Sequence, residues 1–137
     1  MTRTKGADMK KMLCLAVFAL GLATPAVAAD WVWLGNNSDN TNTIFGDADS
    51  RTDNSAWFEI RHAKPQKARY GKFYNTMKML GEVDCRGKRL RNLMVTMYSK
   101  SGKLIDSDTA SYAKWDYVVP GTGQEIVYKF VCNRYPR

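Results

Sequence analysis

The fold of this chain is decided by the segment PGTGQEIVYKFVC, which runs from Pro120 to Cys132. Thr122 and Glu125 have the spacing of a capping box, in which two side chains satisfy backbone N–H groups at a helix start. An apolar stripe follows at helical spacing, formed by Ile126, Val127, Phe130 and Val131. Because a helix of about ten residues is marginal alone in water, we expect this helix to pack on another element.

Cys132, at the end of this expected helix, indicates what the helix packs on. The chain has three cysteines, and Cys14 lies in an N-terminal apolar run that is typical of a leader. Removing the leader leaves Cys85 and Cys132, and in an oxidising compartment such a pair is interpreted as a disulfide. Cys85 lies in a strand-like region. We therefore predict a sheet with the C-terminal helix linked to one face by a Cys85–Cys132 disulfide.

The N-terminal residues have the layout of a secretory signal peptide. Lys10 and Lys11 precede an uncharged run that ends in the small residues Ala26-Val27-Ala28. A membrane anchor needs about 20 apolar residues, and this run is shorter. We predict a cleaved signal peptide over residues 1–28, with either Met1 or Met9 as the start, and one domain over residues 29–137. The expected location is the periplasm, the cell surface or the medium, without stable membrane insertion.

Charge remains basic after the leader is removed. Lys plus Arg fall from 21 to 17 and Asp plus Glu from 13 to 12, so the net charge falls from +8 to +5. The leader also contains no lipobox, because Cys14 lies early in the apolar run with Lys11-Met12-Leu13 before it. We therefore do not expect a lipoprotein.

Alternating apolar and polar residues predict about six strands, over residues 30–35, 41–45, 55–62, 73–85, 90–99 and 104–109. Residues 64–68 read as a polar connection, since proline is excluded from central strands. Met77, Met79 and Val83 share the parity of Cys85, so the helix should cover their face, with Gly81 leaving room for it. Leu93, Val95 and Met97 should alternate with polar residues. The predicted fold class is α+β, an antiparallel sheet with one C-terminal helix.

No catalytic or cofactor motif is found in the sequence. It contains no HExxH, CxxC, phosphate-binding glycine loop or nucleophile elbow. We interpret His62, the one histidine, as a structural strand residue. Asp47, Asp49 and Asp53 lack the later glutamate of a calcium loop and read as solvated. We therefore predict a noncatalytic protein with no cofactor and no metal site.

A cluster of cations directly after Cys85 is the candidate ligand site. We call it the basic corner, and it consists of Arg86, Lys88, Arg89 and Arg91. Cations on a rigid corner attract acidic proteins or polyanions, whereas the alternative is a solvated turn that prevents edge aggregation. A second patch is a candidate to extend the corner, and it consists of Lys64, Lys67, Arg69 and Lys72.

Aromatic residues near these cations would also suit single-stranded nucleic acid. An exported protein rarely meets such a partner, so we expect no nucleic-acid ligand. Sheet packing explains the aromatics better, namely Trp31, Trp33, Trp57 and Phe58.

Short motifs recur here in a familiar order: Asp30-Trp31-Val32, an Asp-rich turn, Lys64-Pro65-Gln66, Val83-Asp84-Cys85, Trp115, Pro120-Gly121-Thr122 and Val131-Cys132. From Trp31 to Cys132 the chain resembles the surface-adhesin protein E family of Gram-negative bacteria. The resemblance implies an antiparallel sheet with a disulfide-linked C-terminal helix. It also implies an adhesin that captures host extracellular-matrix and plasma proteins, with dimerisation and haem binding attributed to the family's named member. That member is a lipoprotein, unlike the chain predicted here.

Two functions follow from these observations. The first is an exported noncatalytic binding module that engages a protein or polyanionic ligand at the cell envelope or host surface. The second is a periplasmic housekeeping or inhibitor-type domain with an envelope component or a secreted enzyme as its partner. An enzyme using His62 is a third and weaker hypothesis.

Overall fold

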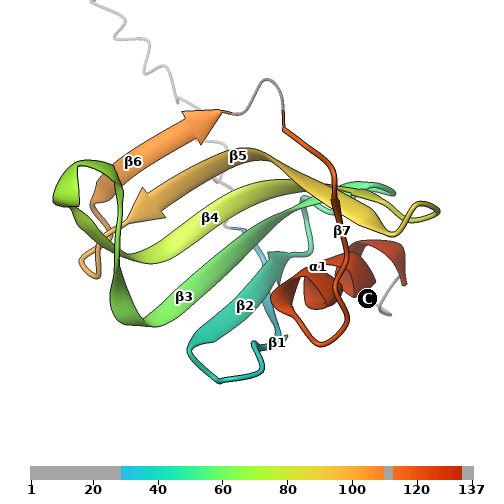
Figure 1. Cartoon of the computed structure of the whole chain (residues 1–137), viewed down its shortest axis with the longest axis horizontal. Helices are drawn as coiled ribbons and strands as arrows, with labels where there is room; N and C mark the ends of the chain where they lie inside the picture. The colour runs from blue at the N-terminus through green and yellow to red at the C-terminus, as the bar shows by residue number, and fades with distance from the viewer. Residues whose placement is uncertain (1–28, 110–112, 134–137) are drawn as a thin grey trace, which may run out of the picture.

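The sheet is a meander in which each strand pairs antiparallel with the next strand along the chain (Figure 1). The computed structural model describes residues 29–109 and 113–133, so the predicted signal peptide lies outside the described residues. The main strands are β1 (Trp31–Asn36), β2 (Asn42–Asp47), β3 (Ser55–Lys67), β4 (Phe73–Asp84), β5 (Arg89–Tyr98) and β6 (Leu104–Thr109). A 3-10 turn, η1 (Arg69–Gly71), links β3 to β4, and a two-residue strand, β7 (Asp116–Tyr117), also pairs with β5. With the helix α1 (Gly123–Cys132), these elements confirm the predicted α+β class.

Strand β3 is longer than its sequence indicates. The predicted connection over residues 64–68 is wrong, because β3 continues through Pro65 to Lys67. Pairing with β2 ends at His62, and the register with β4 is irregular between Arg61 and Gln66. Proline has no N–H to donate, so the irregular stretch accommodates Pro65 without the loss of a regular ladder hydrogen bond.

A bulge in β5 keeps one face of the sheet apolar. Leu80 pairs with Met94 but Gly81 pairs with Asn92, so Leu93 is an extra residue in the ladder. The bulge reverses the parity of the strand. Leu90 opposite Val83 and Val95 opposite Met79 therefore lie on the same face. The predicted alternation holds for Val95 and Met97 and is wrong at Leu93.

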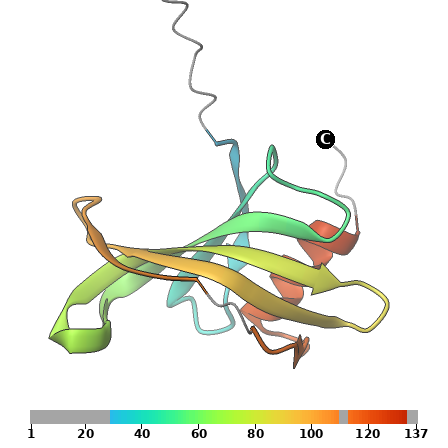
Figure 2. The same cartoon turned by 90° about the horizontal axis from the view of Figure 1, so that it is seen from above.

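Helix α1 packs on this apolar face at one end of the sheet (Figure 2). Val127, Phe130 and Val131 are buried, as the predicted stripe requires. The Phe130 ring meets the Phe58 ring edge-on, with 5.8 Å between their centroids. A Cβ on Gly46 would lie 2.7 Å from the Phe130 ring, whereas one on Gly81 would meet Phe58. The glycine that makes room for the helix is therefore Gly46 in β2, and the prediction of Gly81 is wrong.

The start of α1 differs from a capping box. The helix begins after Thr122 as predicted, but the Thr122 hydroxyl donates to the Val119 carbonyl at 2.6 Å. Glu125 accepts a hydrogen bond from the N–H of Gly121 at 2.8 Å. Both side chains thus stabilise the preceding turn.

In the described part of the chain, no helix has the length and apolar character that a membrane crossing requires.

The Cys85–Cys132 disulfide joins the end of α1 to the end of β4, which confirms the predicted link. The two Cα atoms are 5.7 Å apart. One helical turn earlier, the Tyr128 hydroxyl donates to the Cys85 carbonyl at 2.8 Å. The covalent bond and the hydrogen bond fix the C-terminal part of the helix beside the β4–β5 turn.

Candidate functional site

The β4–β5 turn carries the basic corner and is held from several sides. Within the turn, the Gly87 N–H donates to Asp84 Oδ1 at 2.9 Å. On the other side, the Val118 N–H donates to the Lys88 carbonyl at 2.9 Å. The disulfide at Cys85 directly precedes the turn. Arg86 and Lys88 therefore project into solvent from a backbone that is fixed in place.

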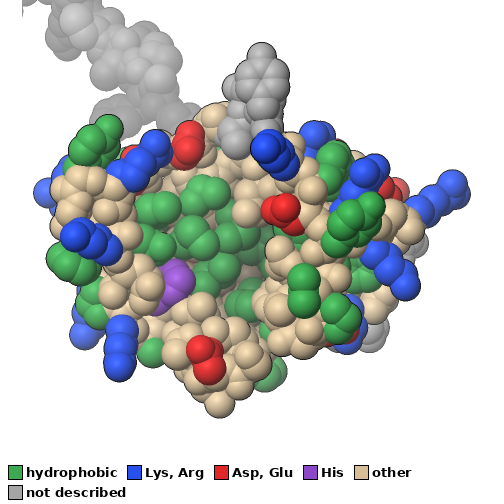
Figure 3. All heavy atoms as spheres, in the orientation of Figure 1, with side chains coloured by type: hydrophobic (Ala, Val, Ile, Leu, Met, Phe, Trp, Pro, Cys, Tyr) green, Lys and Arg blue, Asp and Glu red, His purple; other side chains and the backbone are tan. Residues whose placement is uncertain are grey.

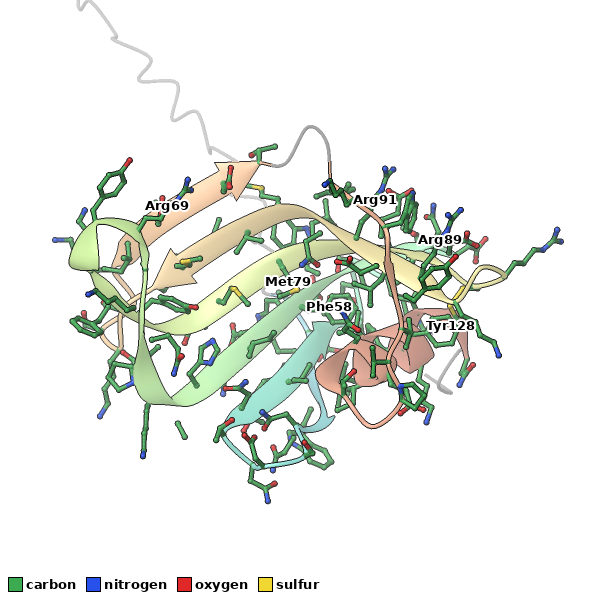
Figure 4. All side chains as sticks on the ribbon, in the orientation of Figure 1. Phe58, Arg69, Met79, Arg89, Arg91 and Tyr128 are labelled. Atoms are coloured by element: carbon green, nitrogen blue, oxygen red, sulfur yellow. A yellow bond between two sulfur atoms is a disulfide. The ribbon has the colours of Figure 1, made fainter. Side chains whose placement is uncertain are left out.

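The other two cations of the basic corner are paired. Arg89 Nε lies 2.8 Å from Asp84 Oδ2, and an Arg91 terminal nitrogen lies 2.7 Å from Glu82 Oε2. Both guanidinium groups also lie over the Trp115 ring, at 5.1 and 4.5 Å from its centroid. The structure thus brings the four predicted residues to one end of the sheet, where Figure 4 labels Arg89 and Arg91, but leaves only Arg86 and Lys88 uncompensated.

The sequence reasoning missed the two carboxylates, although a signal for them exists. In the β4–β5 register Asp84 stands directly opposite Arg89, and Glu82 directly opposite Arg91. Opposite charges at such cross-strand positions attract each other. Counting outward from a hairpin centred between Arg86 and Gly87 predicts both pairs.

Electrostatics at the basic corner are mixed. The hydrogen bond from the Gly87 N–H, followed by that from Arg89, holds the pKa of Asp84 below its usual value. An open pocket of about 330 Å³ lies beside the turn, and its lining includes Glu82, Asp84, Arg86 and Trp115. Acids, a cation and an aromatic ring therefore meet in one place. This mixture suits polar and stacking contacts with protein side chains better than a densely charged polyanion.

The second cationic patch lies at the opposite end of the sheet, so its predicted union with the basic corner is wrong. The whole length of β4 separates the two, and Figure 4 labels Arg69 far from Arg89 and Arg91. We call this end the distal tip, defined as residues 64–73 with the β5–β6 turn at residues 99–104. Arg69 pairs there with Asp106 at 3.4 Å and Asp108 at 3.5 Å on β6.

A shallow apolar hollow lies between the two basic ends, on the same face as α1 (Figure 3). The one histidine, His62, lies at the edge of the hollow. Ile60, Met77 and Val95 lie on neighbouring strands and are partly buried against the core. His62 Nδ1 lies 2.7 Å from Asn42 Oδ1, and its ring meets Tyr74 edge-on. Burial lowers the pKa of His62, so the ring is neutral at pH 7.

His62 has the surroundings of a structural residue on the Nδ1 side, but its Nε2 is buried without a hydrogen-bond partner among the described residues. Those residues contain no group of three His, Cys, Asp or Glu side chains placed to hold a metal ion. Nothing in this arrangement supplies a nucleophile beside a base that a third group orients.

The aromatic residues divide into core and surface. Phe58 is fully buried at the centre of the core, which agrees with the prediction of sheet packing. Trp33 is 61 % exposed on β1, so sheet packing is the wrong interpretation for that residue. The reason is position, because β1 is an edge strand of the sheet.

One comparison with known proteins identifies a relationship. The family model described as surface-adhesin protein E matches residues 31–133, which covers nearly all of the described chain. Neither the curated proteins nor the solved structures gave a match.

Proposed function

Because the chain belongs to the surface-adhesin protein E family, we propose that it is an exported, noncatalytic binding module that engages a protein ligand at the cell envelope or host surface. The family supports adhesion as the general role. We propose the basic corner as the contact site, with Arg86 and Lys88 as the residues that reach the ligand. The observation that carries this choice is the fixed, uncompensated pair of cations on the disulfide-linked turn.

Rigidity supports the choice of this site. A binding surface that is already ordered loses little conformational entropy on association. Here the disulfide, the Asp84 hydrogen bond and the contact with residue 118 order the turn before any ligand arrives. Arg89 and Arg91 add guanidinium groups stacked on Trp115, and Arg and Trp are the residue types enriched at interface hot spots.

A double variant tests the site. Arg86→Gln/Lys88→Gln removes the two free cations without touching the ion pairs of Arg89 and Arg91. Immobilised basement-membrane extract and immobilised plasma proteins serve as probes. We expect about tenfold weaker binding, since exposed charges contribute up to about 1 kcal/mol each. The matched control, Lys100→Gln/Lys103→Gln, removes the same charge at the distal tip and should bind like wild type.

One result would contradict the proposed contact site, and another would exclude the host surface as the place of binding. Equal binding by wild type and Arg86→Gln/Lys88→Gln would show that the corner is not the contact site. Protection from protease added to intact cells would exclude capture of host proteins. It would favour the periplasmic housekeeping or inhibitor-type role, for which an envelope component or a secreted enzyme is the partner.

A further inference from the structure

The distal tip exposes large apolar side chains that the fold does not need there. Tyr70 is 95 % exposed, Phe73 58 % and Leu104 55 %. Tyr70 also adopts a left-handed backbone with φ +59, which is strained for a bulky residue. Neither packing nor backbone preference accounts for an aromatic residue at this position. A side chain that is both strained and fully exposed indicates a role outside the folded domain.

The same tip carries lysines without acidic partners. Five lysine side chains are exposed there, and among the described residues no carboxylate pairs with any of them: Lys64, Lys67, Lys72, Lys100 and Lys103. The two carboxylates nearby, Asp106 and Asp108, pair with Arg69 instead. The basic corner differs, because half of its cations are neutralised. The distal tip is therefore the more strongly positive end of the molecule, and blue side chains project from it in Figure 3.

The apolar and basic groups can meet one surface together. Thr76 in β4 pairs with Tyr98 at the end of β5, so η1, which precedes β4, and the β5–β6 turn, which follows β5, lie at the same end of the sheet. The Arg69 ion pairs hold η1 across β5 onto β6. The tip terminates the long axis of the molecule, on the far side from α1 (Figure 1). A flat partner can thus approach the tip without contacting the helix or the disulfide.

We propose that the distal tip docks on the surface of an anionic lipid bilayer. The lysines lie against lipid phosphates, while Tyr70 and Phe73 enter the boundary between headgroups and acyl chains. Basic residues near an anionic membrane are attracted to it, and amphipathic aromatic rings favour the membrane interface. A soluble polyanion would satisfy the lysines but leave the aromatic side chains in water. A bilayer accounts for both kinds of side chain.

Vesicle sedimentation with the exported protein tests the charge requirement. The probe is phosphatidylcholine vesicles containing one-quarter phosphatidylglycerol, compared with vesicles of phosphatidylcholine alone. Each lysine near an anionic surface contributes about a factor of five in affinity, so Lys64→Gln/Lys67→Gln/Lys72→Gln should bind on the order of 100-fold more weakly. The single changes Lys72→Gln at the tip and Lys114→Gln at an exposed site outside both cationic patches form a matched pair. We expect about fivefold weaker binding from the first and wild-type binding from the second. Equal binding to both vesicle types, or equal losses in these two single variants, would overturn the proposal.

A second variant separates a bilayer from a soluble polyanion. Tyr70→Ser/Phe73→Ser keeps every charge, and we expect about tenfold weaker vesicle binding because its apolar contact is lost. Its elution salt on heparin should not change. Unchanged vesicle binding by this variant would show a purely electrostatic patch and would overturn lipid docking. In Tyr70→Trp, the added fluorescence should shift to shorter wavelength on the anionic vesicles, and an unshifted spectrum would contradict insertion. None of these results bears on the basic corner, whose ligand is tested separately.

Discussion

The two ends of the sheet are built from the same strands but differ in helix coverage, in ion pairing and in the exposure of aromatic side chains. At the disulfide end, α1 covers the apolar face and two of the four clustered cations are paired with acids and stacked on Trp115. At the distal tip no helix covers the sheet, the lysines stand without acidic partners, and Tyr70 and Phe73 face solvent. A run of cations in a sequence therefore does not show by itself how much positive charge is exposed in the folded protein. The residues on the neighbouring strand decide whether the charge is available to a ligand.

The largest expected contrast concerns aromatic residues at the two ends. Phe130→Ala removes the ring that packs on Phe58 and beside Gly46. We expect a loss of about 3–5 kcal/mol in the free energy of unfolding, as for other buried Phe→Ala changes. Urea denaturation followed by far-UV circular dichroism measures it. A loss no larger than that of Phe73→Ala at the exposed tip would mean that the helix contributes little to the core.

Opening the disulfide should have the next largest effect. Cys85→Ser/Cys132→Ser removes a cross-link between residues 47 positions apart. Such a cross-link contributes about 2–4 kcal/mol. Hydrogen exchange should accelerate most in α1 and in the β4–β5 turn, and least in the β3–β4 hairpin near η1. Uniform acceleration along the whole sheet would contradict the view that the two ends are separately stabilised.

Relieving backbone strain at the tip should act in the opposite direction. Tyr70→Gly replaces a bulky residue at φ +59 by one that adopts this conformation freely. The expected result is a gain of about 0.5–1 kcal/mol in stability, since the left-handed region costs an ordinary residue about 1–2 kcal/mol and glycine returns part of that as unfolded-state entropy. Thermal denaturation measures the change. Lys88→Gly, at φ +49 in the basic corner, should gain a similar amount of stability. A loss of stability in Tyr70→Gly would show that the Tyr70 side chain packs within the domain.

The smallest effect is a pH dependence that arises from Asp84 at the β4–β5 turn. The pKa of Asp84 is lowered by the Gly87 N–H and by Arg89. Its charge therefore stabilises the folded state above the ordinary carboxyl pKa of 3.8, and this contribution is lost as pH falls through the lower folded-state value. Asp84→Asn keeps an acceptor for Gly87, so the difference in melting temperature between it and wild type should narrow from pH 7 to pH 2.5. A difference that stays constant with pH would exclude a role for the charge.

Much of the fold follows from the sequence because the spacing of apolar side chains along a helix or strand acts locally. The apolar stripe of the last helix, the face of β4 that carries Cys85 and the disulfide itself are predictable in this way. The bulge at Leu93 is not, since it arises from matching two strands that each have a regular pattern. The role of Gly46 in making room for α1 is not predictable for a similar reason, because it depends on the position of the Phe130 ring in the folded structure.

The candidate site was less accessible to sequence reasoning than the fold. The four cations of the basic corner do lie together at one end of the sheet. The acids that pair with two of them come from the preceding strand, and only the register brings these acids opposite Arg89 and Arg91. Pro65 led to the opposite error. A rule about central strands ended β3 too early, although the residue lies where the ladder is already irregular. Both errors come from pairwise geometry that a single strand does not encode.

The meander order has a consequence for how the chain matures during export. Each strand pairs with the strand that precedes it in the chain, so pairing from β1 to β6 involves mostly residues that are close in sequence. Such a topology favours rapid folding. The helix is the exception, because it returns from the end of the chain to strands β1 and β2. Until the segment that forms α1 has been exported, Cys85 therefore has no disulfide partner. The apolar face of the sheet stays uncovered for the same time. A product truncated before Cys132 would therefore have no partner for the Cys85 thiol and no complete helix to cover the apolar face of the sheet.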